Sequence, residues 1–173
     1  MDNNIDLITV QLGGSLDLKG NAKLTGNKGM LGGGIYAVGD SGVGESVTVS
    51  MSGNAEISGN TVPSIGGGIF IGGYDTIFTI SENAVIKNNT APNNGGGVYL
   101  ARGSFIMNGG EISGNTATTG NGGGVYINAG ANFTVASEQV KAGIHGNTAP
   151  SGPQVYVYSG GTFTVGGAPT TSY

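Results

Sequence analysis

The sequence contains no cysteine and little charge, and both absences narrow its chemistry. Without cysteine, the 173-residue chain has no disulfides, no thiolate metal ligands and no cysteine nucleophile. Only 9% of its residues are charged, and its six basic residues are scattered along a chain with a net charge of -4. Because nucleic acids and anionic membranes are recognised by clustered lysine and arginine, we expect neither as a partner.

Long apolar runs are also missing. No stretch approaches the roughly eighteen apolar residues of a membrane-spanning helix, so we expect no membrane insertion. The first residues, Met1 to Asn4, lack the basic residues and the apolar segment of a secretory signal. An export signal is therefore not present in this sequence.

Glycine, in contrast, is abundant, at 37 residues, and it recurs in register with the apolar residues, which make up 37% of the chain. A motif of three glycines followed by an apolar, an aromatic and another apolar residue occurs at 32–37, 66–71, 95–100 and 122–127. A fifth copy at 152–157 has Pro153 and Gln154 in place of two glycines. A period of about thirty residues indicates a repeat architecture.

Two further columns repeat with the same period. One is an alternating triplet that begins at Leu16, Val47, Phe78, Phe105, Phe133 and Phe163. The other is an apolar residue followed, three residues later, by an asparagine. Alternation over so few residues is typical of short strands, and segments of about three residues are too short for helices. We therefore expect strands and no helix.

The sequence predicts an all-β fold, a parallel β-helix with three short strands per coil and about five complete coils stacked about 4.8 Å apart. Residues 1–173 are predicted to form a single domain. Residues 1–15 would form an incomplete first coil, residues 16–157 the five coils and residues 158–173 an incomplete last coil.

Stacked coils place equivalent residues above one another, which accounts for the residue types. The apolar residue after each glycine run, the phenylalanine column with Val47, and the Leu or Ile before each asparagine would form three inward walls. The glycines suit corners that need positive φ or close approach. A structural asparagine ladder is predicted, with left-handed backbone and amide hydrogen bonds between coils. It contains Asn27, Asn60, Asn89, Asn115 and Asn147.

The pairing of the glycine motif with the apolar-x-x-asparagine motif resembles the repeats of chlamydial polymorphic outer-membrane proteins and related bacterial right-handed β-helix surface proteins. The resemblance covers nearly the whole chain and implies a right-handed coil in a cell-surface setting. It transfers no catalytic residue, because the shared motifs are structural. The family usually has alanine at the positions of Gly34, Gly68, Gly97 and Gly124.

The main candidate for binding is an outward aromatic ladder. Stacked aromatic residues are able to bind sugar rings or a protein partner, but they also stabilise a parallel sheet, and we favour the structural interpretation. The ladder contains Tyr36, Phe70, Tyr99, Tyr126 and Tyr156.

Other outward residues suggest weaker alternatives. A column of Thr48, Thr79, Thr134 and Thr164, interrupted by Asp17 and Ile106, resembles an ice-binding surface, which typically needs two such columns. Glu56 and Glu111 are predicted to lie on one face about 9.6 Å apart, which is within the range of an inverting glycosidase pair. No arginine or aspartate joins them in the motif, and His145 is predicted to lack a partner. We therefore expect no enzyme activity and no catalytic, cofactor-binding or metal-binding residue.

We thus predict a non-catalytic extracellular or cell-surface β-solenoid with a structural or adhesive role, with a cell-surface or glycan partner. Both ends of the predicted stack leave sheet edges open, so we also expect self-association through the end coils, head to tail, into filaments. The alternatives are a carbohydrate-binding or carbohydrate-degrading β-helix and, more weakly, an ice-binding protein.

Overall fold

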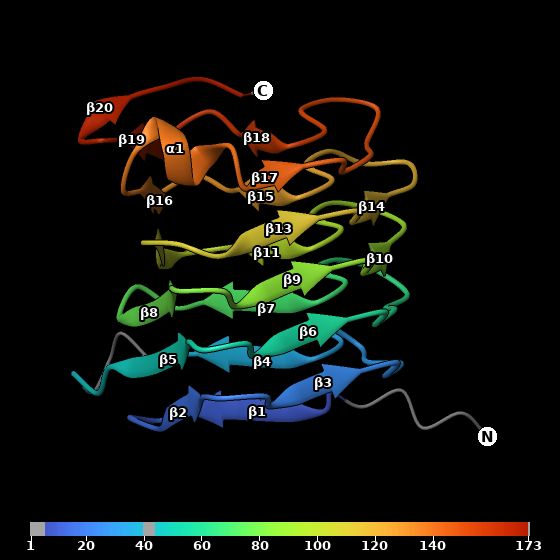
Figure 1. Ribbon diagram of the computed structural model, residues 1–173, viewed down its shortest axis with the longest axis vertical. Coiled ribbons are helices and arrows are strands. Elements are labelled where there is room, and N and C mark those ends of the chain that lie inside the picture. Colours follow the sequence, from blue (N-terminus) through green and yellow to red (C-terminus); the bar gives the residue numbers. More distant parts are fainter. Residues whose placement is uncertain (1–5, 40–43, 173) are drawn as a thin grey trace.

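The computed structural model describes residues 6–39 and 44–172, which form a stack of parallel coils (Figure 1). Each coil contributes one strand to each of three sheets. All pairs of neighbouring strands are parallel except one, in which β19 (Thr162–Val165) and β20 (Ala168–Pro169) run antiparallel. The predicted all-β solenoid is confirmed.

The first sheet, which we call the glycine-motif sheet, contains β1 (Ile8–Gln11), β4 (Ile35–Val38), β7 (Ile69–Gly72), β11 (Val98–Leu100), β15 (Val125–Ile127) and β18 (Val155–Val157). The phenylalanine sheet contains β2 (Ser15–Leu18), β5 (Val47–Met51), β8 (Thr76–Ile80), β12 (Gly103–Met107), β16 (Ala131–Val135), β19 (Thr162–Val165) and β20 (Ala168–Pro169). The asparagine sheet contains β3 (Lys23–Thr25), β6 (Glu56–Ser58), β9 (Val85–Lys87), β13 (Glu111–Ser113) and β17 (Ile144–His145).

A fourth short ladder, which the sequence interpretation missed, follows the asparagines. It pairs β10 (Thr90–Ala91) with β14 (Thr116–Ala117), and single parallel bridges extend it to the neighbouring coils. These strands lie along the right-hand edge of the view in Figure 1. They turn the chain from the asparagine sheet toward the next glycine motif.

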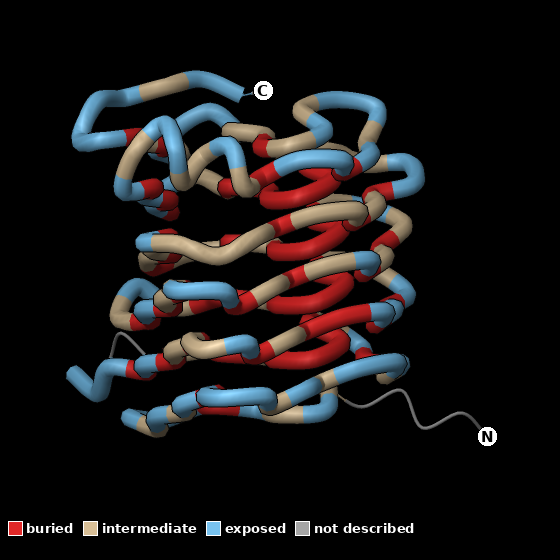
Figure 2. Tube along the Cα trace, viewed as in Figure 1, coloured by how far each residue is buried: buried red, intermediate tan, exposed pale blue. Residues whose placement is uncertain are grey.

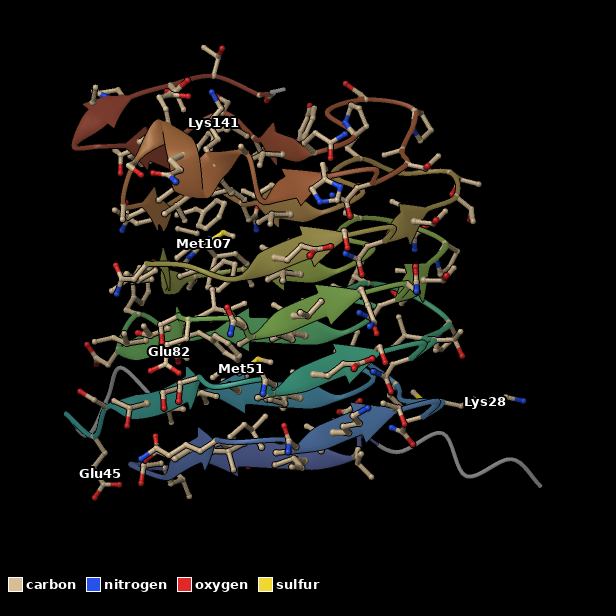
Figure 3. All side chains as sticks on the ribbon, in the orientation of Figure 1. Lys28, Glu45, Met51, Glu82, Met107 and Lys141 are labelled. Atoms are coloured by element: carbon tan, nitrogen blue, oxygen red, sulfur yellow. The ribbon has the colours of Figure 1, made fainter. Side chains whose placement is uncertain are left out.

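The core is a column of apolar side chains enclosed by the three sheets. Phe78, Phe105, Phe133 and Phe163 are almost completely buried on one wall, and the apolar residues of the other two walls are also buried, except Leu24 of the first coil, which is partly buried. Figure 2 shows this buried column in the middle coils and a more exposed first coil. Figure 3 shows the side chains of Met51 and Met107, both fully buried, within the stack.

The predicted register of one strand is wrong. Val49, and not Val47, pairs with Phe78, while Val47 pairs with Thr76. Both valines are buried, because they lie two residues apart on the same face of a strand. This two-residue ambiguity also places Thr48 in a different outward column from Thr79.

The expectation that the chain has no helix is also wrong. One helical turn, α1 (Glu138–Lys141), interrupts the corner between β16 and β17. The Ser137 side chain accepts a hydrogen bond from the backbone N–H of Val140 and so caps this turn. The insertion lengthens one corner and leaves the strands in register.

The asparagines do not adopt the left-handed backbone expected of them. Positive φ occurs instead one residue earlier, at Gly26, Gly59, Gly114 and Gly146, and at Asn88 with a φ of 54°. The first glycine of each glycine motif is also left-handed, as predicted; Gly95, for example, has a φ of 69°. A residue with a Cβ would be strained at these glycines.

The sequence predicted an open edge at the C-terminal side of the phenylalanine sheet, but in the structure this edge is paired. After β19 the chain reverses, and β20 pairs antiparallel with it, Val165 opposite Ala168. At the neighbouring sheet, the backbone N–H of Val157 donates to Oγ of Ser172 at 2.8 Å. Residues after Val165 therefore cover part of the last coil.

Candidate functional site

The aromatic ladder runs along the outer face of the glycine-motif sheet. Its five members pair directly across β4, β7, β11, β15 and β18. Consecutive ring centroids lie 5.1, 5.6, 5.1 and 5.4 Å apart, and consecutive ring planes differ by 5–13°. Because each ring stacks face to face on the next, the inner rings offer only their edges to a ligand.

Burial of the ladder further favours its structural interpretation. Tyr126 is only 6% exposed, and the other four members are half-buried. Burial, together with the neighbouring tyrosines, raises the pKa of Tyr126 to about 12. Sugar binding by stacking uses ring faces, and within the ladder these faces already contact one another.

The asparagine ladder lies inside the corner that follows the asparagine sheet. Nδ2 of Asn89 donates to Oδ1 of Asn115 at 3.0 Å and to the Ile57 carbonyl at 3.1 Å. Its Oδ1 accepts from both the backbone N–H and Nδ2 of Asn60, each at 3.0 Å. Asn60, Asn89 and Asn115 are fully buried, so these bonds replace water that cannot reach the corner.

Gln154, which replaces the third glycine of the motif, ends this ladder. Its Oε1 accepts from Nδ2 of Asn147 at 2.9 Å and from the Asn147 backbone N–H at 3.3 Å. Elsewhere in the ladder the same two groups, the backbone N–H and Nδ2 of Asn60, donate to Oδ1 of Asn89. Gln154 thus supplies the acceptor that the next asparagine supplies in the other coils. The sequence singled out this altered motif, but a change that occurs once has no repeat pattern from which to infer its partner.

The outer face of the phenylalanine sheet carries a second polar surface, which we call the hydroxyl face. It consists of two columns of six residues: Ser15, Thr48, Ile77, Ser104, Asn132 and Thr162 in the first, and Asp17, Ser50, Thr79, Ile106, Thr134 and Thr164 in the second. Eight of the twelve carry a hydroxyl group and one carries a charge. Neighbouring hydroxyls also bond along a column, Thr164 Oγ1 to Thr134 Oγ1 at 3.1 Å.

The sequence interpretation found only one interrupted column on this face. The other members of the first column were missed because they precede the repeating triplets, and the register of β5 places Ser50, and not Thr48, beside Thr79. Comparison of the corners would have shown this. The segment from Ser52 to Ala55 matches Ser81 to Ala84 in length, so the residues before the two corners must align.

The outer face of the asparagine sheet carries charged residues. Glu56 lies 3.2 Å from Lys87 and 3.7 Å from Lys23, and the Ser58 hydroxyl donates to it at 2.6 Å. The hydrogen bond from Ser58 is the main cause of the lowered pKa of Glu56. The carboxylate is thus engaged by its neighbours on the same face.

Glu111 and His145 meet on the next coils of this face. Nε2 of His145 lies 3.6 Å from Oε1 of Glu111, and the Ser113 hydroxyl donates to the same carboxylate. The expectation that His145 lacks a partner is therefore wrong. As predicted, Val85 stands between Glu56 and Glu111 in the strand register.

Within residues 6–39 and 44–172, no three acidic or histidine side chains are grouped as metal ligands would be. In the same ranges, no helix has the length and apolar character to cross a membrane.

Comparison with known proteins gives one match. A family model of a right-handed β-helix region matches residues 45–166, well over half of the chain. No curated protein and no solved structure matches the sequence or the fold significantly.

Proposed function

The chain belongs to the right-handed β-helix family, and from this premise we propose that it is a non-catalytic adhesive and structural element at the cell surface or outside the cell. The observation that carries the proposal is the hydroxyl face. A face built from eight hydroxyl groups, one amide, one carboxylate and two isoleucines suits a hydroxyl-rich partner with little charge, such as an extended glycan. Burying hydroxyls against hydroxyls exchanges hydrogen bonds without removing charges from water.

The periodicity of this face supports the same partner. Each coil presents one residue per column, so hydroxyl groups recur about every 4.8 Å along the axis. In β8, β12, β16 and β19, residues of the two columns flank a buried phenylalanine, and the tight packing of these rings holds the spacing fixed. A rigid row of this kind binds an extended chain with little loss of its own conformational entropy.

The charged residues of the asparagine sheet support a non-catalytic role. Glu56 is held by two lysines and a serine, and Glu111 by a serine and His145. These contacts arise between neighbouring coils of a flat outer face. The lysine contacts of Glu56 are surface ion pairs, which add little to stability individually.

Binding of the purified chain to a panel of neutral polysaccharides and a glycan array tests this proposal. The variant Thr134→Lys places a charged side chain in the middle of the hydroxyl face and is expected to abolish binding. The matched control, Thr25→Lys, makes the same change at an exposed strand position of the asparagine sheet and should bind normally. Absence of glycan binding, or equal loss in both variants, would refute the proposal.

Ice binding is a second candidate, and the second column of the hydroxyl face favours it. Ice-binding requires two hydroxyl columns in register, whereas the sequence indicated only one. Thermal hysteresis of the purified chain, lost in Thr134→Lys and retained in Thr25→Lys, would support this function. An unchanged freezing point at high protein concentration would exclude it.

We also propose self-association, but through the first coil. Head-to-tail stacking would require residues after Val165 to leave the last coil, since β20 occupies the outer edge of β19. The first coil instead exposes Leu12 at 65% and Leu7 at 48%. Sedimentation of the chain at increasing concentration tests this contact, and a monomer at every concentration would refute it.

A further inference from the structure

The corner between β12 and β13 contains an asparagine–glycine pair whose environment differs from that of the other two such pairs in the chain. We propose that Asn108 is a site of spontaneous deamidation, in which the backbone nitrogen of Gly109 displaces ammonia from the Asn108 side chain. The proposal concerns this corner and is independent of the function proposed above.

The corner is short and open. Asn108 to Gly110 spans three residues, whereas the equivalent corner of the preceding coil, Ser81 to Ala84, spans four. The missing residue leaves a hollow of about 220 Å³, lined by Glu82, Asn83, Val85, Gly110 and Glu111. Figure 3 shows Glu82 on the outer surface at this side of the stack. Water thus has access to the corner.

The reacting groups are accessible as well. The Asn108 side chain is exposed, while its backbone N–H donates to the Ile80 carbonyl at 2.9 Å and fixes the start of the corner. Among the residues that the structure describes, the Gly109 N–H makes no backbone hydrogen bond. Gly109 also has no Cβ to obstruct the approach of the preceding side chain to its nitrogen.

The other two pairs are protected by the fold. In Asn94–Gly95, the glycine N–H donates to the Asn121 carbonyl at 3.0 Å, and in Asn121–Gly122 it donates to the Ser151 carbonyl at 3.1 Å. Both glycines are buried, with φ values of 69° and 68°. Attack by either nitrogen would first break an inter-coil hydrogen bond.

The reaction is balanced with water as its only co-reactant. The Gly109 nitrogen loses its proton to solvent and forms a bond to Cγ of Asn108, and the bond from Cγ to Nδ2 breaks as ammonia leaves. Water then opens the resulting succinimide ring at either carbonyl, giving aspartate or isoaspartate. The product places a new carboxylate on the corner beside the hollow that Glu82 and Glu111 line.

The test is incubation of the purified full chain at mildly alkaline pH, followed by peptide mapping with mass spectrometry. Cleavage after Glu111 places Asn108 and Asn121 on different peptides, and Arg102 separates Asn94 from both. We expect Asn108 to convert about tenfold faster than the other two sites, because their glycine hydrogen bonds must first open. In urea, the three rates should become similar.

Each result decides the proposal. The variant Asn108→Gln lengthens the side chain beyond a favourable ring closure, so conversion on this peptide should cease. Equal rates at the three sites of the folded chain would overturn the proposal. The same order of rates in urea would also overturn it, since local sequence and not the fold would then set the selectivity.

Discussion

Truncation of one buried asparagine should cost far more stability than truncation of an exposed one that makes the same kind of bond. Replacing Asn89 with alanine removes the acceptor for the backbone N–H of Asn60 and for one Nδ2 proton of Asn60. Asn60 is fully buried, so neither donor can turn to water. An unpaired buried donor costs about 1–3 kcal/mol, which gives about 2–6 kcal/mol for the two.

Asn54 provides the matched control. It lies in an exposed corner, where its Nδ2 donates to Oδ1 of Asn21 at 3.1 Å and its Oδ1 accepts from Asn83 at 3.4 Å. The amide-to-amide contact between coils is the same, but water replaces every lost partner. We expect Asn54→Ala to change the free energy of unfolding by no more than about 0.5 kcal/mol.

Urea unfolding followed by circular dichroism measures both variants. We expect the urea midpoint of Asn89→Ala to fall clearly below that of the parent chain and the urea midpoint of Asn54→Ala to stay unchanged. If Asn89→Ala gives no soluble protein, Asn147→Ala, which removes a buried member nearer the end of the ladder, takes its place. Losses of similar size at the buried and the exposed site would refute the argument that burial, and not the amide contact, sets the cost.

Three further predictions concern pH and the end of the ladder. Because the pKa of Tyr126 is raised to about 12, the contribution of this residue to stability is present below pH 10 and is lost as the pH rises toward 12. In an alkaline absorbance titration, Tyr126→Phe should lack one tyrosine that ionises late in the parent chain. An unchanged late phase in this variant would contradict the prediction. The pKa of Glu56 is lowered, mainly by the Ser58 hydroxyl, so its contribution is present above pH 4.5 and is lost as the pH falls through the folded pKa. Glu56→Gln should therefore flatten acid denaturation, and an unchanged pH profile would argue against the prediction. Replacing Gln154 with glycine restores the regular motif but removes two hydrogen bonds to Asn147, and we expect a loss of about 1–3 kcal/mol in urea unfolding; a stabilised variant would disprove it.

The sequence predicted the solenoid because its repeats reveal equivalent positions directly. Every inward column continues through five or six coils, so a single ambiguous residue does not obscure the fold. The register of β5 was mispredicted because Val47 and Val49 both fit the inward pattern, and only corner length separates them. The first column of the hydroxyl face went unseen for a different reason, because residues such as Ser15, Ser104 and Thr162 precede the apolar triplets that reveal the repeat.

Features that occur once were beyond the reach of repeat analysis. The helical turn α1 and the antiparallel strand β20 involve residues that have no counterpart in the other coils, and the contact between Glu111 and His145 depends on the single histidine of the chain. For such features the repeat supplies a position but no partner. Their partners depend on side-chain contacts between particular coils, which only coordinates provide.

The third glycine of each motif shows how the asparagine ladder constrains its neighbours. A Cβ added at Gly97 would lie 2.9 Å from Cγ of Asn115, and one added at Gly124 would lie 2.9 Å from Nδ2 of Asn147. The backbone of the next coil is closer still, because the same two Cβ atoms would lie, respectively, 2.7 Å from the Gly124 carbonyl oxygen and less than this distance from the Gln154 carbonyl oxygen. Glycine is needed there because the backbone carbonyl and the asparagine amide of the next coil together fill the space where a side chain would stand.

Gln154 occupies the position of the third glycine in the last copy of the motif and carries a side chain there. Among the described residues, β18 is the last strand of its sheet, so no described coil beyond it presents an amide or a backbone carbonyl at this position. The Gln154 side chain fills it and supplies the acceptor that Asn147 would otherwise lack. The motif thus accommodates a side chain at the copy that has no described coil beyond it, and there the side chain also completes the hydrogen bonds of the asparagine ladder.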